Sequence, residues 1–600
     1  MIVRSAVRRS AYYDSVTLMQ AQQALRGLPG IVEAGVVMGT EANLDLLRQA
    51  GLDPGRIAAS ADDLVVAVRG DTKEHVEAAL ASLDGLLRSR PSSDVTDHTY
   101  RPRTVGAAAR LLPGANLALI SIPGRFAAGV AREACDAGLH VMLFSDNVPV
   151  EDEVRLKQRC HSRGLLCMGP DCGTAFIGGA ALAFANRVRR GPIGLVAAAG
   201  TGLQEVMSVV HRLGGGVSHA IGTGGRDLAA AVGGITMLDG LMLLGRDPGT
   251  TVVVMISKPP DPAVARRLLE HASGVEKPVV MAFVGASPGV RGSGNLYPAA
   301  TLEEAGILAV QLGGAPRDVE DEVGRWIEAA RQRAGALRIR LGSSQRYLRG
   351  LFSGGTLCAE ALSLLQSALR PLFTNVPAGS AQSLASPGRS LAHTVLDLGA
   401  DEFTVGRLHP MLDMTLRAQR LAQEAADPEV AVIVLDVVLG EGVHPDPAGA
   451  LGPVIAEARS SARAAGRELV VIADVCGTDL DPQNRAHQVA RLEAAGVVVE
   501  DTNARAAALA GAIVAGGADA EAIWPRVMRR TPRPGPEGAP ASTAGGETPA
   551  LLAGTPRVVN VGLARFAESL HAQGMSVIDV DWRPPAEGDR AMLELLDKLE

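Results

Sequence analysis

Two glycine-rich turns have the composition of an anion-binding site. The turn Gly200-Thr201-Gly202 follows the apolar segment Ile193–Ala198 and precedes an expected helix at Leu203–Leu213. The turn Ser353-Gly354-Gly355-Thr356 repeats this arrangement after Leu348–Phe352. The first amide groups of a helix lack partners within the helix, and the helix dipole places a partial positive charge there. Two such helix ends could bind one phosphate or carboxylate, although ordinary α/β proteins also contain turns of this kind without a ligand.

A third turn, Gly169-Pro170-Asp171-Cys172-Gly173-Thr174, follows the apolar segment Leu165–Met168. Ligands of open α/β sheets bind at the carboxyl ends of the strands, so this turn is a candidate ligand loop. Cys172 would be reactive if a helix end lowered the pKa of its thiol. The alternative is that Cys172 is a small buried residue in a tight turn, and the sequence leaves both interpretations open.

The histidines and cysteines lack the spacing of a metal site. The sequence contains no HExxH motif and no CxxC pair. Polar residues near expected strand ends could hold a metal, but such residues are more often solvated or capping: His409, His444, Asp436, Glu441 and Asp474. No metal is therefore predicted. The P-loop motif is also absent from the sequence.

The candidate turns lie within a regular alternation of strands and helices, which indicates parallel sheets with helices on their faces. One block of this kind covers residues 104–190, a second covers 191–330 and a third covers 345–527. The second and third blocks both begin with a strand, a glycine-rich turn and a helix. We interpret this similarity as a weak internal duplication.

Three further segments complete the expected organisation. Residues 1–95 mix strands and helices in a ferredoxin-like α+β order. Residues 531–555 are rich in proline, glycine and alanine, which is typical of a disordered linker. Residues 556–600 are expected to form a small tail domain, with strands at Arg557–Val561 and Ser576–Asp581.

Composition excludes several classes of function. The chain has 600 residues, with 58 basic and 65 acidic side chains, a net charge of −7 and only 3% aromatic residues. This balance argues against binding to nucleic acid or to an anionic membrane. No apolar run reaches ~18 residues, and no apolar segment of a signal peptide follows the basic N-terminus. Six scattered cysteines form no disulfide framework, so a cytoplasmic location is expected.

Several motifs resemble one enzyme superfamily. They are Leu117–Ile122 followed by Pro123 and Phe126, Ser145–Pro149, Gly169–Cys172, Gly200–Gly202, Ser353–Leu357 and Leu396–Gly399. Through them, residues 104–313 resemble the α subunit of succinyl-CoA synthetase, and residues 346–515 resemble the carboxyl domain of its β subunit. The resemblance implies a Rossmann-like CoA-binding domain and two flavodoxin-like ligase domains. It also implies that coenzyme A would bind at Pro123, Arg125, Ser145, Asn147, Pro170, Asp171 and Cys172.

Further motifs extend the resemblance over nearly the whole chain. They are Tyr12–Leu18, Val37–Asn43 and Asp581-Trp582-Arg583-Pro584-Pro585, and with them the sequence is identified as a member of the FdrA family. The resemblance implies an oligomeric acyl-CoA synthetase of the succinyl-CoA ligase superfamily. Some members are subunits of oxamate carbamoyltransferase, an enzyme of allantoin breakdown that works with partner subunits encoded nearby. The tail motif resembles part of such a neighbour, which implies a fused docking element.

The chain departs from the synthetase at the positions that carry its chemistry. The strand Lys277–Val280 precedes a loop, Gly289–Leu296, that lacks the phosphorylated histidine of the synthetase. No histidine occurs between His271 and His393, and Lys258 stands where the synthetase has a supporting glutamate. The segment between residues 313 and 348 cannot hold the nucleotide-binding ATP-grasp module of ~200 residues. This chain alone therefore cannot carry out the phosphohistidine relay to ADP.

Three functions remain open. The first is an acyl-CoA ligase-type reaction, in which acyl phosphate forms between the two helix ends. The second is transfer of a carbamoyl or acyl group to free phosphate, with Lys258 and Arg291 as catalytic cations that neutralise phosphate or a substrate carboxylate. The third is a non-catalytic scaffold. The anion in the first two would bind at Gly200, Thr201, Gly202, Ser353, Gly354, Gly355 and Thr356.

Overall fold

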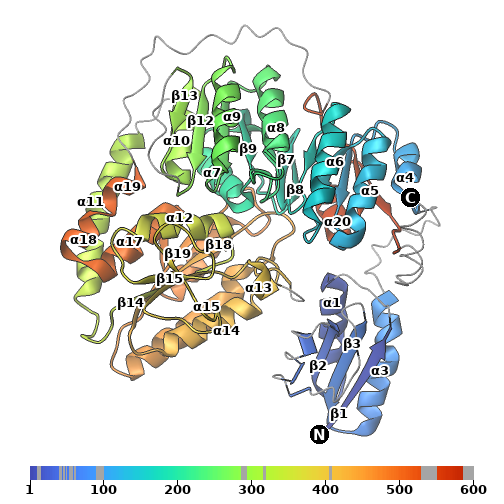
Figure 1. The fold of residues 1–600 in the computed structure, drawn as a ribbon. Helices are drawn as coiled ribbons and strands as arrows, with labels where there is room; N and C mark the ends of the chain where they lie inside the picture. The colour runs from blue at the N-terminus through green and yellow to red at the C-terminus, as the bar shows by residue number, and fades with distance from the viewer. Residues whose placement is uncertain are drawn as a thin grey trace.

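A computed structural model of the chain describes residues 1–9, 15–39, 43–44, 47–48, 51–52, 59, 63–88, 101–285, 294–314, 319–404, 408–528 and 551–584. The described strands form four sheets, and Figure 1 shows helices packed around them, which confirms the expected mixed α/β fold. Several features named from the sequence lie outside the described residues: Tyr12–Asp14, Thr40–Ala42, Arg291, most of the expected linker, and residues 585–600 of the expected tail domain.

The N-terminal unit has a small antiparallel sheet, as its ferredoxin-like pattern predicted. Its strand order is β1-β3-β2. The elements are β1 (Ile2–Arg8), α1 (Ser15–Arg26), β2 (Ile31–Met38), β3 (Leu64–Gly70) and α3 (Lys73–Arg88). Successive residues of β3 point to opposite faces of the sheet. Leu64, Val66 and Val68 share a hydrophobic core with α1 and α3, whereas Val65 and Ala67 belong to a second cluster.

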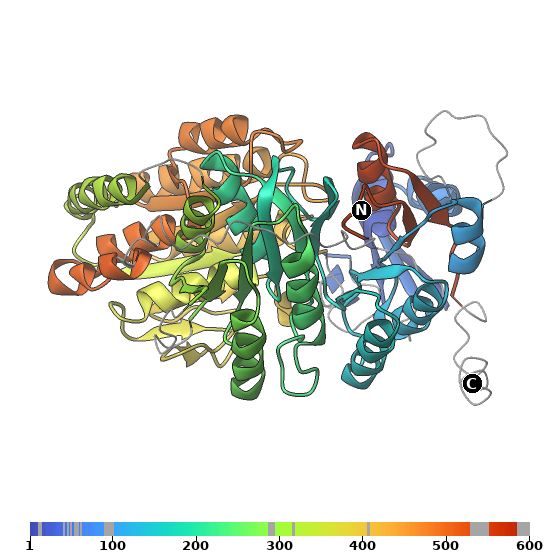
Figure 2. The same cartoon turned by 90° about the horizontal axis from the view of Figure 1, so that it is seen from above.

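The next sheet has the parallel order β22-β21-β4-β5-β6. Its elements are α4 (Val105–Leu111), β4 (Leu117–Ile120), α5 (Gly124–Asp136), β5 (His140–Leu143), α6 (Val150–Ser162), β6 (Cys167–Met168), β21 (Val558–Val561), α20 (Ala564–Ala572) and β22 (Val577–Val580). Figure 2 shows the C-terminal elements, in red, beside the blue and cyan ones.

This pairing corrects one expectation from the sequence. The strands expected to form a separate tail domain instead belong to the sheet of the 104–190 block, where β21 pairs with β4 in parallel. The physical reason lies in β4, whose four residues are all apolar and buried. A parallel strand of this composition is stable only with a partner on each edge and cover on both faces.

The second block forms a sheet with the order β13-β12-β11-β9-β10-β7-β8. Its elements are β7 (Thr174–Ile177), β8 (Ala180–Ala183), β9 (Arg190–Ala197), α7 (Gly200–Arg212), β10 (Val217–Gly222), α8 (Ile235–Arg246), β11 (Val252–Ser257), α9 (Pro262–Ser273), β12 (Val279–Phe283), β13 (Leu296–Pro298) and α10 (Leu302–Leu312). The hairpin β7–β8 and the strand β10 were not anticipated from the sequence.

The third block has the parallel order β16-β15-β17-β14-β18-β19-β20, and the long helix α11 (Val319–Arg338) precedes it. Its elements are β14 (Tyr347–Phe352), α12 (Gly355–Leu365), β15 (Leu372–Thr374), β16 (Gln382–Ser383), β17 (His393–Asp397), α13 (Asp401–Thr404), α14 (Thr415–Ala426), β18 (Val430–Val438), α15 (Pro447–Ala464), β19 (Val470–Cys476), α16 (Arg485–Ala494), β20 (Val498–Glu500), α17 (Asn503–Ala515), α18 (Gly517–Glu521) and α19 (Trp524–Val527).

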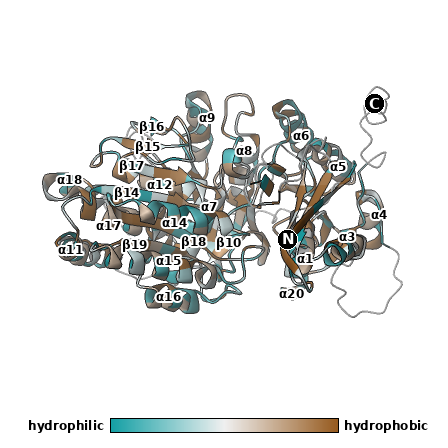
Figure 3. Cartoon of the chain, turned by 90° about the horizontal axis from the view of Figure 1, so that it is seen from below, coloured by the Kyte–Doolittle hydropathy of each residue, from teal (hydrophilic) through white to brown (hydrophobic). Residues whose placement is uncertain are grey.

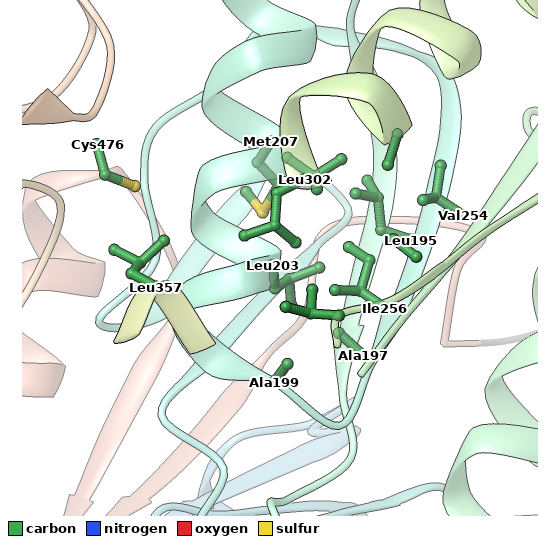
Figure 4. Close-up of a cluster of buried hydrophobic side chains, with 14 of the residues drawn as sticks. Leu195, Ala197, Ala199, Leu203, Met207, Val254, Ile256, Leu302, Leu357 and Cys476 are labelled. Carbon is green, nitrogen blue, oxygen red and sulfur yellow. The ribbon is translucent and has the colours of Figure 1, made fainter. Parts of the chain in front are cut away.

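The second and third blocks share a hydrophobic core around α7. Figure 4 shows Leu203 and Met207 of α7 together with Leu195 of β9 and with Leu357 and Cys476 of the third block. Burial of each large apolar side chain contributes roughly 1.5–3 kcal/mol. Figure 3 shows hydrophobic colours along the strands and hydrophilic colours on outer helices such as α16. Because α7 packs on both blocks, its first turn has a fixed position at their boundary.

Candidate active site between the helix ends

The first turns of α7 and α12 lie against each other. A Cβ atom built on Gly354 would lie 2.8 Å from Oγ1 of Thr201, and one built on Gly202 would lie 2.8 Å from Cγ2 of Thr356. The contact is reciprocal, since each glycine accommodates the threonine of the opposite turn. The two glycine-rich turns singled out in the sequence are therefore adjacent, and any larger residue at Gly202 or Gly354 would push the helix ends apart.

Some of the amide donors at this junction already have acceptors within the chain. The amides of Ser353 and Gly354 each donate to the Asp436 carboxylate at 2.8 Å, and Nη2 of Arg417 donates to the same group at 2.8 Å. Neither α7 nor α12 has a side-chain cap on its first turn. The donors that remain for a ligand are therefore those of Gly355 and Thr356 on α12 and of Gly200–Gly202 on α7.

Lys258 follows β11 and lies at the start of α12. Its Nζ atom is 3.3 Å from a Cβ built on Gly355, and Oδ2 of Asp397 is 2.6 Å from that same point. The Lys258 side chain is exposed, whereas Asp397 is buried. A cation, a carboxylate and a helix N-terminus therefore meet at one place. The sequence-predicted Arg291 lies outside the described residues.

Two aspartates near Lys258 have raised pKa values. Burial raises the pKa of Asp397 to about 6, and it is opposed by Lys258 and by the amide of Gly399, which donates to Oδ1 at 2.9 Å. The Asp171 side chain is accessible to solvent on one side. Desolvation by the protein that surrounds the rest of the carboxyl group is the largest cause that raises its pKa to about 6, and the charges of Asp146 and Asp401 contribute to the rise. Both carboxyl groups therefore change charge near pH 6, and the charge of Lys258 lowers the pKa of each.

His409 is a site residue whose place the sequence did not reveal. Its Nε2 atom lies 2.9 Å from a Cβ built on Gly399, and Oδ1 of Asp397 lies 3.2 Å from that point. Burial, reinforced by Arg417, lowers the pKa of His409 to about 4. The amide of Met411 donates to Nδ1 at 3.2 Å, which assigns the proton of the neutral ring to Nε2. His409 can thus present a neutral N–H donor beside Asp397.

No metal cluster accompanies His409. Within the described part of the chain, no three His, Cys, Asp or Glu side chains are grouped so that they could hold a metal ion. The sequence signal for His409 was only its place near the expected strand ends of the third block. The position of His409 beside Asp397 depends on β17 and on the fold of the segment before α14. The local sequence pattern does not predict that fold.

The residues assigned to coenzyme A lie at the carboxyl edge of the five-stranded sheet. Pro123 caps α5, Arg125 is in its first turn, Ser145 and Asn147 follow β5, and Pro170 and Asp171 follow β6. The loops touch, because a Cβ on Gly124 would collide with the backbone of Asp146. The amide of Asp171 donates to the carbonyl of Ser145 at 2.9 Å. Oγ of Ser145 is buried and has no hydrogen-bond partner among the described residues, so this edge retains a polar group for a ligand.

Cys172 belongs to the same loop, but it is not a reactive thiol. Its side chain is buried, and its Sγ atom lies 3.6 Å from the carbonyl of Thr174. Burial raises the pKa of Cys172 to about 12, so the thiol is not ionised at neutral pH. The interpretation of Cys172 as a residue activated by a helix end is wrong, because no solvent reaches the sulfur.

Two family models match the chain. The model described as CoA-ligase matches residues 351–513, and the model described as the heavy metal-associated domain of AllF matches residues 1–102. The uncharacterized protein YahF of Escherichia coli is 43% identical over 522 residues, which cover 87% of this chain and 100% of YahF. The chain belongs to the YahF family.

Parts of the chain are also similar to more distant proteins. The α subunit of ADP-forming succinate–CoA ligase from Aquifex aeolicus is 31% identical over 188 residues, 30% of this chain and 60% of that subunit. A dinucleotide-forming acetyl-coenzyme A synthetase from Ca. Korarchaeum cryptofilum has 17% identity and a TM-score of 0.31, over 73% of this chain and 89% of that one. No helix among the described residues is long and apolar enough to cross a membrane.

The metal that the AllF model's description implies does not fit this N-terminal unit. Soft heavy-metal ions prefer thiolate ligands, and residues 1–102 contain no cysteine, since the first cysteine of the chain is Cys135. The match to that model therefore concerns the fold.

Proposed function

We propose that this chain is an acyl-CoA synthetase-like enzyme of the FdrA type, which handles an acyl or carbamoyl group next to phosphate held between α7 and α12. One observation carries the proposal: two helix N-termini without side-chain caps abut, and Lys258 lies at their junction. Each helix end offers free amide donors and about half a positive charge. A phosphoryl oxygen at this position would receive donors from both helices and the charge of the lysine.

The other site residues have supporting roles in this proposal. Asp397 places a carboxyl group close enough to the Lys258 ammonium to interact with its charge, and neutral His409 offers its Nε2 proton to a substrate oxygen. A preorganised donor that stabilises developing charge is worth roughly 2–4 kcal/mol of transition-state stabilisation. Coenzyme A would be held at Pro123, Arg125, Ser145, Asn147, Pro170 and Asp171, and it would supply a thiol that accepts the acyl group.

A second candidate function is phosphate-dependent carbamoyl transfer. It is favoured by Lys258 at a position where the synthetase has a glutamate, and by the absence of histidine between His271 and His393. In that reaction a phosphate oxygen attacks the ureido carbonyl carbon of oxalurate, the C–N bond to the oxamate nitrogen breaks, and that nitrogen takes up a proton. The products are carbamoyl phosphate and oxamate. Participation of partner subunits and an oligomeric state stay predictions.

Anion binding tests both versions of the proposal. We expect calorimetry to detect phosphate binding by the full chain and to find none for Lys258→Glu. The matched control is Arg246→Glu, which makes the same charge change on an exposed residue at the end of α8 and should bind like the native chain. Absence of phosphate binding by the native chain would refute the proposal.

Two activity measurements separate the candidate functions. Coenzyme A that remains bound through purification would favour the acyl-CoA synthetase. Phosphate-dependent cleavage of oxalurate in the presence of partner subunits would favour the carbamoyltransferase. Phosphate binding without any activity, with every partner present, would leave only a scaffold.

A further inference from the structure

The five-stranded sheet is assembled from two ends of the chain. Strands β4, β5 and β6 lie on one side of it, and β21 and β22, which come from the C-terminal segment Leu551–Pro584, lie on the other. β21 pairs with β4 over its full length, from Val558 opposite Leu117 to Val561 opposite Ile120. Without the C-terminal segment, β4 would be an edge strand with unpaired backbone groups.

The C-terminal segment contacts the sheet mainly through buried apolar side chains, as residues do in a protein interior. Val559, Val561 and Val580 share one buried cluster with residues of β4, β5 and α5. The ring of Trp582 lies 5.6 Å from the ring of Phe126. The amide of Asp581 donates to the carbonyl of Pro102 at 2.8 Å. Burial and specific hydrogen bonds therefore contribute to holding this segment against the sheet, in addition to the chain connection.

The same segment also reaches the second block. Gln573 at the end of α20 exchanges two hydrogen bonds with the backbone of Ala181 in β8, both of 2.9 Å. Leu551 and Leu552, at the start of the segment, are buried in the large core of the second and third blocks. The segment thus joins the five-stranded sheet to its neighbour.

The C-terminal segment forms part of the carboxyl edge of the five-stranded sheet, where the residues proposed to bind coenzyme A also lie. The strand order reverses between β21 and β4, and α20 and α5 start directly after these two strands. Crevices at such a reversal are the usual ligand sites of open α/β sheets. Gly562 has φ +122°, and a Cβ on it would lie 2.6 Å from the carbonyl oxygen of Ser121. The amide of Leu563 donates to Oγ of Ser121 at 2.8 Å, so the two loops are in direct contact.

We infer that the segment Leu551–Pro584 is a docking module, a strand–helix–strand unit that binds the edge of β4 through its own contacts, so that a separate polypeptide carrying this segment can occupy the same place. Such a polypeptide would bring its Gly562 loop to the ligand edge of the sheet. The inference goes beyond the proposed function and does not depend on it. YahF aligns over its whole length with only 87% of this chain, so the chain carries sequence that YahF lacks.

The test begins with the full chain carrying a protease site between residues 530 and 550. After cleavage, we expect the two fragments to co-elute in gel filtration at micromolar concentration. After separation in denaturant and dilution, we expect the large fragment to take up a tagged copy of residues 551–600. Dissociation of the fragments under native conditions, or failure to take up the tagged segment, would overturn the inference.

Two variants of the cleavable chain test the interface itself. Gly562→Val should weaken the association about 100-fold, because the added side chain meets the Ser121 loop and the backbone disfavours it. Gly554→Ala is the matched control in the same segment, since a Cβ there meets nothing within 4 Å, and its association should be unchanged. Equal association of both variants would contradict the proposed contact. Circular dichroism of the uncleaved variants checks that the rest of the chain is folded.

Discussion

At the scale of single residues, the charge of the candidate site depends on pH through its two aspartates, Asp397 and Asp171. Asp397 and Asp171 have pKa values of about 6, and His409 stays neutral above its pKa of about 4. Below pH 6 the site contains a lysine and two neutral carboxyl groups, which favours an anion. Above pH 6 the carboxylates compensate the lysine.

We therefore expect anion binding to weaken as the pH rises. Sulfate is a suitable probe because its own charge is constant from pH 5 to pH 8. Its affinity, measured by calorimetry, should fall about tenfold over this range as Asp397 and Asp171 ionise. Asp397→Asn should remove part of this dependence while keeping an acceptor for the Gly399 amide. A flat profile for the native chain would show that the aspartates do not face the bound anion.

At the scale of secondary-structure elements, the site depends on how closely helices and loops from different blocks approach one another. The start of α7 touches the start of α12, and α6 is joined to the loop before α8 by a buried ion network. Each contact includes a residue whose substitution should disturb it, Gly202 in the first and Lys157 in the second. Substitutions at these points therefore test the element packing separately from the chemistry.

The first such test concerns the glycine contact of the two helix ends. Gly202→Val should destabilise the chain by about 1–3 kcal/mol and weaken phosphate binding more than tenfold, because the side chain would overlap Thr356. Gly335→Val in α11 is the control, since a Cβ there meets nothing within 4 Å. Denaturant unfolding and calorimetry provide the two measurements. Native-like phosphate binding by Gly202→Val would argue against a ligand between the helices.

The second test concerns Lys157 of α6. Its buried Nζ atom lies 2.9 Å from Glu153 and 2.7 Å from Asp227, and it donates to the carbonyl of Thr223 at 3.0 Å. Lys157→Met would leave the Asp227 carboxylate buried without its cation and Glu153 paired only with Arg226, at a cost of about 3–5 kcal/mol in the free energy of unfolding.

Arg155 of the same helix provides the control for Lys157. It forms an exposed ion pair with Asp152, and Arg155→Met should cost at most about 1 kcal/mol. Chemical denaturation of both variants checks this difference. Similar unfolding free energies would mean that the Lys157 network is not what holds α6 against the second block.

At the scale of the whole molecule, buried acids should make stability depend on pH. Glu360 of α12 lies in the interface of the second and third blocks, where burial raises its pKa to about 8. A carboxyl group with a raised pKa binds more protons in the folded state than in the unfolded state between its two pKa values. The free energy of unfolding should therefore fall as the pH rises through that range.

The contribution of Glu360 can be measured as the slope of the unfolding free energy against pH. Buried histidines with lowered pKa values near 4 act in the opposite direction, but only up to about pH 6.5. Between pH 6.5 and pH 8 the Glu360 effect should therefore appear, at up to about 1.4 kcal/mol per pH unit. Glu360→Gln should reduce this slope in denaturant unfolding. An unchanged slope in the variant would assign the proton uptake to other groups.

The sequence predicted the elements of the fold better than it predicted their partners. Apolar runs before glycine-rich turns identified β9, β14 and the starts of α7 and α12, because strand, turn and helix are adjacent in the chain. The placement of β21 beside β4 and of His409 beside Asp397 was missed. Such pairings join distant segments, and neither leaves a local pattern. Arg291, which was predicted as a catalytic cation, stays untested by the structure.

The pairing of β4 with β21 has a consequence for the synthesis of the protein. The contact between Ser121 and Val561 spans 440 residues of sequence. At roughly 5–20 residues per second, a ribosome takes about 20–90 s to add that length of chain. During this time β4 has left the ribosome while its partner strand does not yet exist. The nascent chain must therefore keep an apolar strand edge from associating with other chains, which makes residues 117–120 a natural site for a chaperone to cover.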